Sequence, residues 1–329
     1  MNAPVAEKQR APRNRTITLT QSQREALATV LVSPTAVGAS LTNAIVLGDC
    51  LSVAPKLGRH TVDLLFLDPP YNLNKCFGET QFSRRSVDDY ANWLGSVIDA
   101  FLPALKPSAS VYICGDWHTS ASIFTAATGR LIIRNRITWE REKGRGALSN
   151  WKNSSEDIWF CTLGREFTFN VDAVKLRRKV IAPYRDGAGR PKDWSEGPNG
   201  NVRDTHPSNL WTDITIPFWS MPENTDHPTQ KSEKLLAKIL LASTNPGDLV
   251  LDPFLGSGTT AVVAQKLGRR FLGVETVEDY ALLAAHRLEL ARRDSGIQGY
   301  VDGVFWERNS TTMQGASRAV TTPTEDLFR

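Results

Sequence analysis

The sequence predicts an α/β fold built on a doubly wound, mostly parallel, Rossmann-like sheet. Five short apolar runs are typical of strands, and their consecutive apolar residues suit strands that helices cover on both faces. Helical patterns alternate with these runs, which is the order of elements that such a sheet requires. The expected strands are Ala44–Leu47, Val62–Leu67, Ser110–Cys114, Leu249–Leu251 and Arg270–Val274, and the expected helices are Asp88–Leu105, Thr119–Ala127, Ser232–Ala242, Thr259–Leu267 and Val277–Arg293.

Length and composition are those of an ordinary globular chain. Its 329 residues, 41% hydrophobic and 22% charged, suit one catalytic domain of about 200–250 residues with a smaller insert. The chain has neither an apolar run of about 18 residues nor a signal-peptide pattern, so we expect no membrane segment and a cytoplasmic protein. The cysteines Cys50, Cys76, Cys114 and Cys161 form no C-x-x-C pair, which predicts reduced thiols and no metal site.

The segment 132–222 departs from the strand–helix rhythm. After strand-like runs at Ile132–Trp139, Asp157–Thr162 and Phe167–Asn170, it becomes rich in Gly, Pro, Asn and Trp. Such an insert suits a substrate-recognition module, and a structural cap over the sheet is the alternative. We therefore expect a poorly ordered basic N-terminal extension (1–40), one half of the catalytic domain (41–131), the insert (132–222), the second half of that domain (223–298) and a C-terminal tail (299–329).

The first chemical motif is Asp68-Pro69-Pro70-Tyr71, which directly follows the apolar run Val62–Leu67. In a doubly wound sheet, ligands bind beyond the carboxyl ends of strands. The two prolines lack N–H donors, so their carbonyls and the Asp68 carboxylate form an acceptor-rich turn, followed by the aromatic face of Tyr71. This turn suits an amino group on a flat ring. A Pro-Pro turn with a capping Asp and a core Tyr is the structural alternative.

The second motif, from Asp252 to Thr260, follows the apolar run Leu249–Leu251 and contains Gly256 and Gly258. Two glycines at a strand-to-helix turn let the backbone approach a ligand closely. The run Arg270–Val274 then ends at Glu275, and a carboxylate about 20 residues after such a turn is the expected partner of ribose hydroxyls. The motif matches neither a P-loop nor a dinucleotide fingerprint, because the required Gly-Lys and G-x-G-x-x-G spacings are missing.

Together, Asp-Pro-Pro-Tyr and Phe-x-Gly-Ser-Gly-Thr-Thr resemble the amino-methylating DNA methyltransferases, which modify adenine N6 or cytosine N4. The catalytic motif comes first and the cofactor motif last, an order similar to that of the β group of the family, including enzymes of restriction–modification systems. Gly48-Asp49-Cys50, the segment 209–213 and His227–Lys231 extend the similarity. Ser232 stands where the family usually has proline.

The resemblance implies S-adenosyl-L-methionine as cofactor and assigns roles to individual residues. Glu275 would bind the ribose of the cofactor, Asp252 its methionine amino group, and His227 to Lys231 would lie at the methionine end. A role for His227 as a base stays open. The implied catalytic residues are Asp68, Pro69, Pro70 and Tyr71, and the implied cofactor-binding residues are Asp49, Cys50, Asp68, His227, Thr229, Gln230, Lys231, Asp252, Phe254, Gly256, Ser257, Gly258, Thr259 and Glu275.

The expected reaction is site-specific methylation of adenine N6 in double-stranded DNA, by base flipping and direct in-line transfer. Adenine is preferred because cytosine-N4 members of the family more often carry Ser in place of Asp68. The alternatives are cytosine-N4 methylation, a catalytically silent DNA-binding module and a small-molecule or protein amino methyltransferase, the last disfavoured by the basic, Trp-rich insert. A cognate restriction endonuclease or a second copy of the chain are candidate partners. We expect DNA contacts from Arg84, Arg85, Arg141, Lys143, Arg145, Trp151 and Lys152, with a solvated loop as the alternative for the insert residues.

Overall fold

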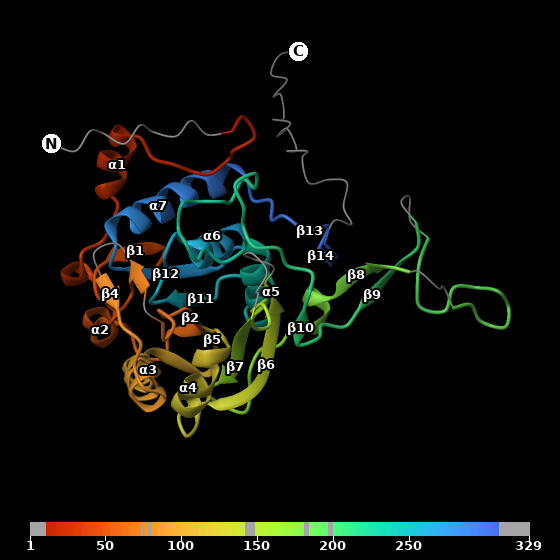
Figure 1. Cartoon of the computed structure of the whole chain (residues 1–329), viewed down its shortest axis with the longest axis horizontal. Helices are drawn as coiled ribbons and strands as arrows, with labels where there is room; N and C mark the ends of the chain where they lie inside the picture. Colours follow the sequence, from red (N-terminus) through yellow and green to blue (C-terminus); the bar gives the residue numbers. More distant parts are fainter. Residues whose placement is uncertain are drawn as a thin grey trace, which may run out of the picture.

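A computed structural model describes residues 11–73, 75–77, 80–141, 149–180, 184–196 and 200–308. Its centre is an eight-stranded sheet with helices on both faces (Figure 1). Seven of these strands run parallel and β7 runs antiparallel between β5 and β6, which confirms the mostly parallel fold. The strand order is β1 (Ala44–Leu47), β12 (Arg270–Glu275), β11 (Leu249–Asp252), β2 (Val62–Leu67), β5 (Leu105–Gly115), β7 (Ser155–Thr162), β6 (Ile132–Glu140) and β10 (Leu210–Trp211).

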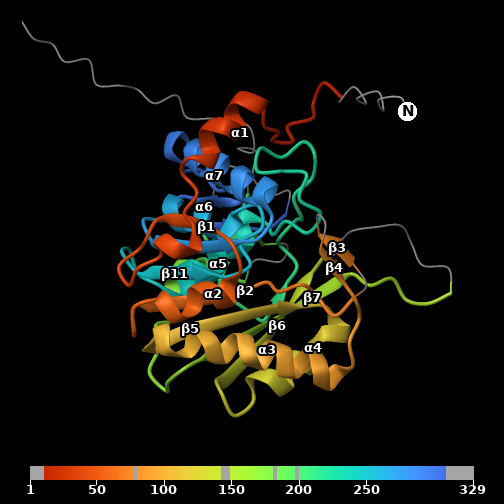
Figure 2. The same cartoon turned by 90° about the vertical axis from the view of Figure 1, so that its left-hand side faces the viewer.

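Side chains that alternate along the central strands build two separate cores. On β2, Leu64 and Phe66 pack on one face, while Leu65 and Leu67 pack on the other. Figure 2 shows α3 and α4 on the opposite side of the sheet from α6 and α7. The first face is covered by α5 (Glu233–Ser243), α6 (Thr259–Lys266) and α7 (Glu278–Arg293), and the second by α2 (Cys50–Val53), α3 (Val87–Phe101) and α4 (Trp117–Ala127). Burial on both faces explains why these strands are almost wholly apolar.

The helix expected to run to Leu105 ends earlier, at Phe101. Pro103 follows, and the chain continues as a short 3₁₀ turn, Leu102–Ala104, before entering β5. Proline has no N–H to continue the α-helical ladder, which accounts for the change. The other 3₁₀ turns are Pro34–Ala36, Ala54–Lys56 and Val171–Val174.

The segment 132–222 divides into two parts. Its first two expected strands are present as β6 and β7, and both belong to the central sheet rather than to a separate insert. The expected strand Phe167–Asn170 is wrong. The Asn170 side chain instead donates hydrogen bonds to the carbonyls of Leu241 and Thr244, both at 3.1 Å, and its backbone N–H donates to the Ala242 carbonyl at 2.7 Å. Asn170 thus fixes this stretch to the end of α5, without strand pairing.

A second, four-stranded sheet joins distant parts of the chain, in the order β13 (Tyr300–Val301), β14 (Val304–Trp306), β8 (Leu176–Lys179) and β9 (Val202–Thr205). Phe305 is fully buried and pairs with Leu176. The expectation of a loose tail from residue 299 is therefore wrong for residues 300–306, because an aromatic side chain anchors them; residues 309–329 lie outside the described residues. In Figure 1, β8 and β9 lead away from the main body.

The N-terminal extension is ordered over its described part, residues 11–40. Helix α1 (Gln21–Ala28) begins with a capping box between Thr20 and Gln23, and it packs against α7 through the buried Leu27. Two isolated bridges, Ile17 with Thr225 and Val32 with Val46, attach the extension to the core. The expectation of disorder is wrong here, because a capped helix with a buried leucine has its own stabilising contacts. Within the described residues no helix is long and apolar enough to cross a membrane.

Candidate active site

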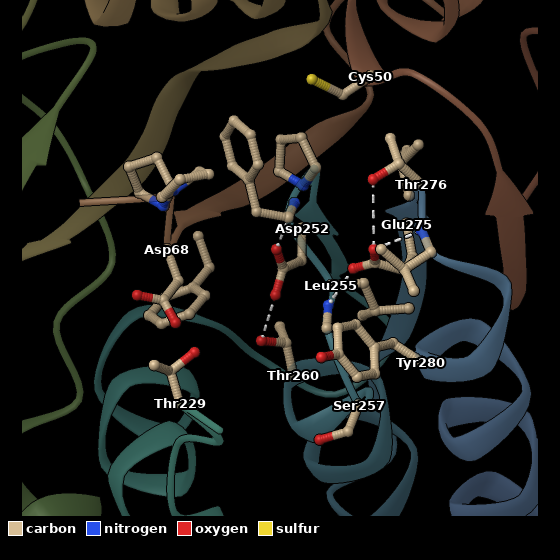
Figure 3. Close-up of a pocket in the computed structure, with 18 of the residues that line it drawn as sticks. Cys50, Asp68, Thr229, Asp252, Leu255, Ser257, Thr260, Glu275, Thr276 and Tyr280 are labelled. Carbon is tan, nitrogen blue, oxygen red and sulfur yellow. Dashed lines mark hydrogen bonds between the residues drawn. The ribbon is translucent and has the colours of Figure 1, made fainter. Parts of the chain in front are cut away.

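The two sequence motifs open into one cavity of about 360 Å³ at the carboxyl ends of β1, β2, β11 and β12. Because β2 and β11 are paired neighbours, with Leu65 opposite Leu251, their following turns face each other although they are far apart in sequence. Figure 3 shows Asp68 at one end of this view of the cavity, Glu275 at the other and Asp252 between them. The volume is within the range of about 300–1,000 Å³ for small-molecule sites.

Most of the expected site residues line this cavity. From the first motif and the segments before it come Asp49, Cys50, Asp68, Pro69, Pro70 and Tyr71, and from the second half come His227, Thr229, Gln230, Lys231, Asp252, Phe254, Gly256, Ser257, Thr259 and Glu275. Trp93, on α3, and Tyr280, on α7, also line it and were not expected. Both belong to amphipathic helix patterns that give no sign of a ligand, so the sequence alone could not distinguish them from core residues.

Asp252 is buried at the end of β11 and holds the motif turn together. Its Oδ1 accepts a hydrogen bond from the Phe254 N–H at 2.9 Å, and its Oδ2 accepts one from the Thr260 hydroxyl at 2.6 Å (Figure 3). Burial raises the pKa of Asp252 to about 7, against the opposing effect of these hydrogen bonds. A cation that enters the cavity would lower the pKa of Asp252, because a nearby positive charge favours the ionised carboxylate.

Glu275 ends β12 and fastens two backbone segments. One carboxylate oxygen accepts from the Gly256 N–H at 2.7 Å, and the other accepts from the Val277 N–H at 2.8 Å. Burial raises the pKa of this carboxyl, and the hydrogen bonds from the backbone oppose the rise. Asp49 caps α2 instead, since its Oδ2 accepts from the Ser52 N–H at 3.1 Å. The neighbouring Cys50 has its pKa raised to about 12 by burial and stays a neutral thiol.

The two glycines of the second motif are needed for different structural reasons. Gly256 has φ of +55°, and a Cβ there would lie 3.1 Å from Nε2 of His227, so its hydrogen lets the imidazole approach the turn. Gly258 has φ of +85°, and a Cβ there would lie 2.5 Å from the Cβ of Ala284 on α7. Gly258 thus packs against a helix, and its expected contact with cofactor gains no support from this position. The His227 ring is also held edge-on by Tyr280, with centroids 4.4 Å apart.

At the first motif, Asp68 is engaged by a lysine. Lys231 Nζ lies 2.8 Å from Oδ1 and 2.7 Å from Oδ2 of Asp68. Burial raises the pKa of Asp68, and the charge of Lys231 opposes that rise. Lys231 was expected at the methionine end of the cofactor; it lines the same cavity, but its ammonium is directed to the Asp68 carboxylate.

A second carboxylate, Glu156 on β7, completes this cluster. Its Oε2 lies 3.6 Å from Nζ of Lys231 and 3.1 Å from the hydroxyl of Tyr71, and its Oε1 lies 2.5 Å from the guanidinium of Arg141. Glu156 is only 4% exposed. The sequence interpretation missed it, because Glu156 is the second residue of β7, between Ser155 and Asp157, and no sequence pattern distinguishes it from an exposed carboxylate.

The Asp68–Tyr71 turn is fixed from outside the cavity. Tyr90, on α3, donates a hydrogen bond to the Pro70 carbonyl at 2.8 Å. Asn72 closes the base of the following loop, because its side-chain oxygen accepts from the Arg85 N–H at 2.7 Å and its amide donates to the Arg85 carbonyl at 3.0 Å. Within that loop, β3 (Lys75–Phe77) pairs with β4 (Thr80–Phe82). Asn72 and Arg85 therefore clamp the two ends of a loop that contains this pair of strands.

The residues expected to contact DNA differ in their exposure to solvent. Arg84, Arg85 and Lys152 are exposed, and Trp151 is 94% exposed. Arg141 does not extend into solvent as a phosphate-binding side chain would, because it forms an ion pair with Glu156, next to Lys231. The remaining two, Lys143 and Arg145, lie outside the described residues. Within the described parts of the chain, no group of three or more His, Cys, Asp or Glu residues could hold a metal ion.

The chain is similar to known proteins over most of its length. The chain is 34% identical to the DNA adenine methyltransferase YhdJ of Escherichia coli (strain K12), over 75% of this chain and 83% of that protein. It is 29% identical to the type II methyltransferase M.BglII of Bacillus subtilis, over 74% and 68%. Among solved structures, the PvuII DNA methyltransferase (cytosine-N4-specific) has a TM-score of 0.57 at 15% identity, covering 81% of this chain and 93% of that chain. The M1.HpyAVI–SAM complex has a TM-score of 0.50 at 23% identity, covering 74% and 98%.

The structural similarities establish a shared fold at these low identities. The family model N6_N4_Mtase, described as DNA methylase, matches residues 62–286. This match spans both motifs and more than half of the chain, so the protein belongs to the N6_N4_Mtase family of DNA methylases.

Proposed function

We propose that this protein transfers a methyl group from S-adenosylmethionine to N6 of adenine in duplex DNA. One observation carries the proposal: the acceptor-rich turn Asp68–Tyr71 and the glycine turn at Gly256 open into the same cavity. A group bound at the first turn is then close to a group bound at the second. Direct transfer between two bound groups requires this proximity.

The residues at the second turn fit the cofactor. When bound, S-adenosylmethionine supplies an electrophilic methyl group on a sulfonium. Glu275 would accept hydrogen bonds from ribose hydroxyls, and Asp252 would pair with the ammonium of the methionine part. Phe254 and Trp93, with ring centroids 6.3 Å apart, provide an apolar wall. Gly256 supports the fit, because any side chain there would fill the space that the backbone and His227 leave open.

The first turn would activate the substrate nitrogen. An exocyclic amino nitrogen is a poor nucleophile because its lone pair is delocalised into the ring. The Asp68 carboxylate and the Pro69 carbonyl would accept its two N–H bonds and favour a tetrahedral nitrogen whose lone pair is available. We assign Pro69 rather than Pro70 to this task, because Tyr90 donates to the Pro70 carbonyl. Tyr71 would stack on the flipped base.

Asp68 would also receive the proton that the nitrogen loses after it gains the methyl group. Burial raises the pKa of this carboxyl above its ordinary value, which makes it a better base than an exposed aspartate. No other titratable residue needs to contact the nitrogen. In particular, His227 lies against Gly256 and Tyr280 on the cofactor side, so we assign it to the wall of the cofactor pocket and not to proton transfer.

Adenine is the proposed base for two reasons. The chain carries Asp68 in its Asp-Pro-Pro-Tyr motif, and the 34% identical relative is named a DNA adenine methyltransferase. For DNA contacts we propose the exposed Arg84, Arg85 and Lys152, with Trp151 as a stacking or wedging side chain. A partner restriction endonuclease, a homodimer and a cytoplasmic location stay predictions.

The test is to incubate the protein with duplex DNA and labelled S-adenosylmethionine, digest the DNA to nucleosides and identify the labelled product. We expect N6-methyladenine. N4-methylcytosine would replace the proposed base with cytosine, and a protein that binds DNA but leaves it unlabelled would be a catalytically silent module. Mapping the modified positions by sequencing would then define a cognate duplex for the experiments below.

A further inference from the structure

We propose that Lys231 is a displaceable stand-in for the amino group of the substrate, and that Glu156 is the positioning residue that receives Lys231 when a base enters. This inference rests on the proposed function, because it concerns the same site. It gives the Asp68–Glu156–Lys231 cluster a role in substrate entry, beyond the structural role that a buried ion pair has by itself.

The ammonium of Lys231 occupies the place that the proposed mechanism gives to the base. It binds both oxygens of Asp68, at 2.8 and 2.7 Å. It also lies 5.4 Å from the centre of the Tyr71 ring, on which the base would stack. The ammonium of Lys231 thus makes the two contacts that we propose for the exocyclic amino group of the base: it donates N–H bonds to the Asp68 carboxylate and lies near the Tyr71 ring. Lys231 and the base therefore compete for one position.

A second acceptor for Lys231 is already in reach. Glu156 Oε2 is 3.6 Å from Nζ, so a shift of about 1 Å would bring the two atoms to the distance of an ordinary charge-assisted hydrogen bond. Arg141 holds the other oxygen of Glu156 at 2.5 Å. This contact orients Glu156 so that Oε2 points to the lysine and to the hydroxyl of Tyr71.

The charges in the cluster allow this exchange without an unpaired buried ion. Asp68 and Glu156 contribute two negative charges, and Lys231 and Arg141 contribute two positive charges. After the shift, Lys231 and Arg141 both pair with Glu156, while the amino group of the base donates to Asp68. A buried charge that lost its partner with no replacement would be strongly unfavourable. Glu156 thus lowers the free-energy cost of freeing Asp68.

The carboxylates of Asp68 and Glu156 also prevent methylation of Lys231 itself. An ammonium has no lone pair and cannot attack a methyl donor. Burial lowers the pKa of Lys231, but the facing carboxylates of Asp68 and Glu156 outweigh burial and hold that pKa above its ordinary value. Lys231 therefore stays protonated, although it lies beside the position from which a neutral amine would be methylated.

The experiment is a double-mutant cycle on the cognate duplex, with Glu156→Gln, Lys231→Met and the double variant. Gln keeps the shape of Glu156 but accepts an ammonium poorly, so Glu156→Gln should lower kcat/KM for DNA by about tenfold or more. The KM for S-adenosylmethionine should not change. In Lys231→Met there is no lysine to displace, so adding Glu156→Gln should lower kcat/KM for DNA little or not at all. Glu156→Asp, which keeps the charge, should restore part of the loss, and Glu166→Gln, in the exposed stretch after the end of β7, is the control.

Equal fractional losses in both backgrounds, or no loss from Glu156→Gln alone, would overturn the inference and leave the proposed function intact. If wild-type protein labels no DNA, the proposed function fails instead. Should the Lys231→Met variants be inactive or unfolded, a crystal structure of the wild-type protein with cognate duplex and S-adenosylhomocysteine decides. Lys231 Nζ bonded to Glu156, with the base on Asp68, supports the exchange. Lys231 still on Asp68, or turned to the cofactor carboxylate, contradicts it.

Discussion

The Thr260 hydroxyl donates a 2.6 Å hydrogen bond to the Asp252 carboxylate, and this contact ties the end of β11 to the first turn of α6. Asp252 lines the cavity with a pKa of about 7, which burial raises and this hydrogen bond partly lowers. The protonation of this one residue should therefore influence both cofactor affinity and the free energy of unfolding near neutral pH.

Cofactor affinity should weaken as the pH falls through about 7. If Asp252 pairs with the methionine ammonium, binding requires its ionised form, so the Kd should rise by up to about tenfold per pH unit below the pKa. Isothermal titration calorimetry between about pH 5.5 and 8.5 would measure this dependence. In Asp252→Asn, binding should be weaker at pH 8 and should lose this part of the pH dependence. A wild-type Kd that is constant across the range would contradict the assignment.

The unliganded protein should show the opposite trend in stability. Between the ordinary pKa of an aspartate, about 3.9, and about 7, the folded state keeps the Asp252 proton that the unfolded state has lost. The Asp252 contribution to the free energy of unfolding therefore falls as the pH rises through this window. Comparing Tm against pH for wild type and Asp252→Asn isolates this contribution from those of other groups.

Asp68→Asn should separate catalysis from cofactor binding. The amide is nearly the same size as the carboxylate, but it is a weaker hydrogen-bond acceptor and cannot take up the proton. We expect kcat to fall by about 10²–10³-fold or more, the range seen when one transition-state hydrogen bond is removed. Cofactor Kd and Tm, measured on the same preparation, test whether the fold and the pocket are intact. Near-normal turnover in Asp68→Asn would remove this carboxylate from the mechanism.

Gly258→Ala should destabilise the protein by about 1–3 kcal/mol. The new Cβ would lie 2.5 Å from Ala284, and the residue already has φ of +85°. Denaturant unfolding gives the free energy of unfolding directly. Gly187→Ala is the matched control, since a Cβ there meets no atom within 4 Å, and it should be neutral or slightly stabilising. Equal stability of both variants would show that α7 moves freely away from the turn.

Removal of residues 299–329 should lower the Tm far more than removal of residues 309–329. The longer deletion takes away the buried Phe305 and the Trp306 carbonyl that accepts from Lys234 at 2.5 Å. It also removes Arg308, whose guanidinium donates to the carbonyls of Glu140 and Ile214 at 3.0 and 2.8 Å. Loss of a buried Phe alone costs about 3–5 kcal/mol. Thermal unfolding of the two truncated proteins tests this, and equal Tm values would mean that β13 and β14 contribute nothing.

Sequence patterns predicted the strands that are buried on both faces, because such strands are continuous apolar runs. They did not predict that β6 and β7 extend the same sheet, since pairing partners are not visible in a single run of residues. The strands β13 and β14 were missed for a related reason. They are two and three residues long, and what orders them is the burial of Phe305 against β8, a contact between residues about 130 positions apart.

The site was predictable where chemistry is concentrated in short motifs, as at Asp68–Tyr71 and Asp252–Thr260. The contacts within it were not. Lys231 was expected beside the cofactor because it belongs to a motif near the second turn, but its ion pair is with Asp68, 163 positions away. Glu156 belongs to no motif, and only the register of β7 brings its carboxylate to Tyr71 and Lys231.

The pairing of β1 with β12 determines when during synthesis the protein becomes able to function. Ala44 pairs with Leu272, and the Gly48 N–H donates to the Glu275 carbonyl. At about 5–20 residues per second, the ribosome needs roughly 10–45 s to make the chain between these strands. Until then β1, which leads into Asp49 and Cys50, lacks its neighbour in the sheet, and the pocket lacks Glu275. A nascent chain therefore cannot assemble the complete site until β12 has been made, and newly made protein should begin to modify DNA only after that point.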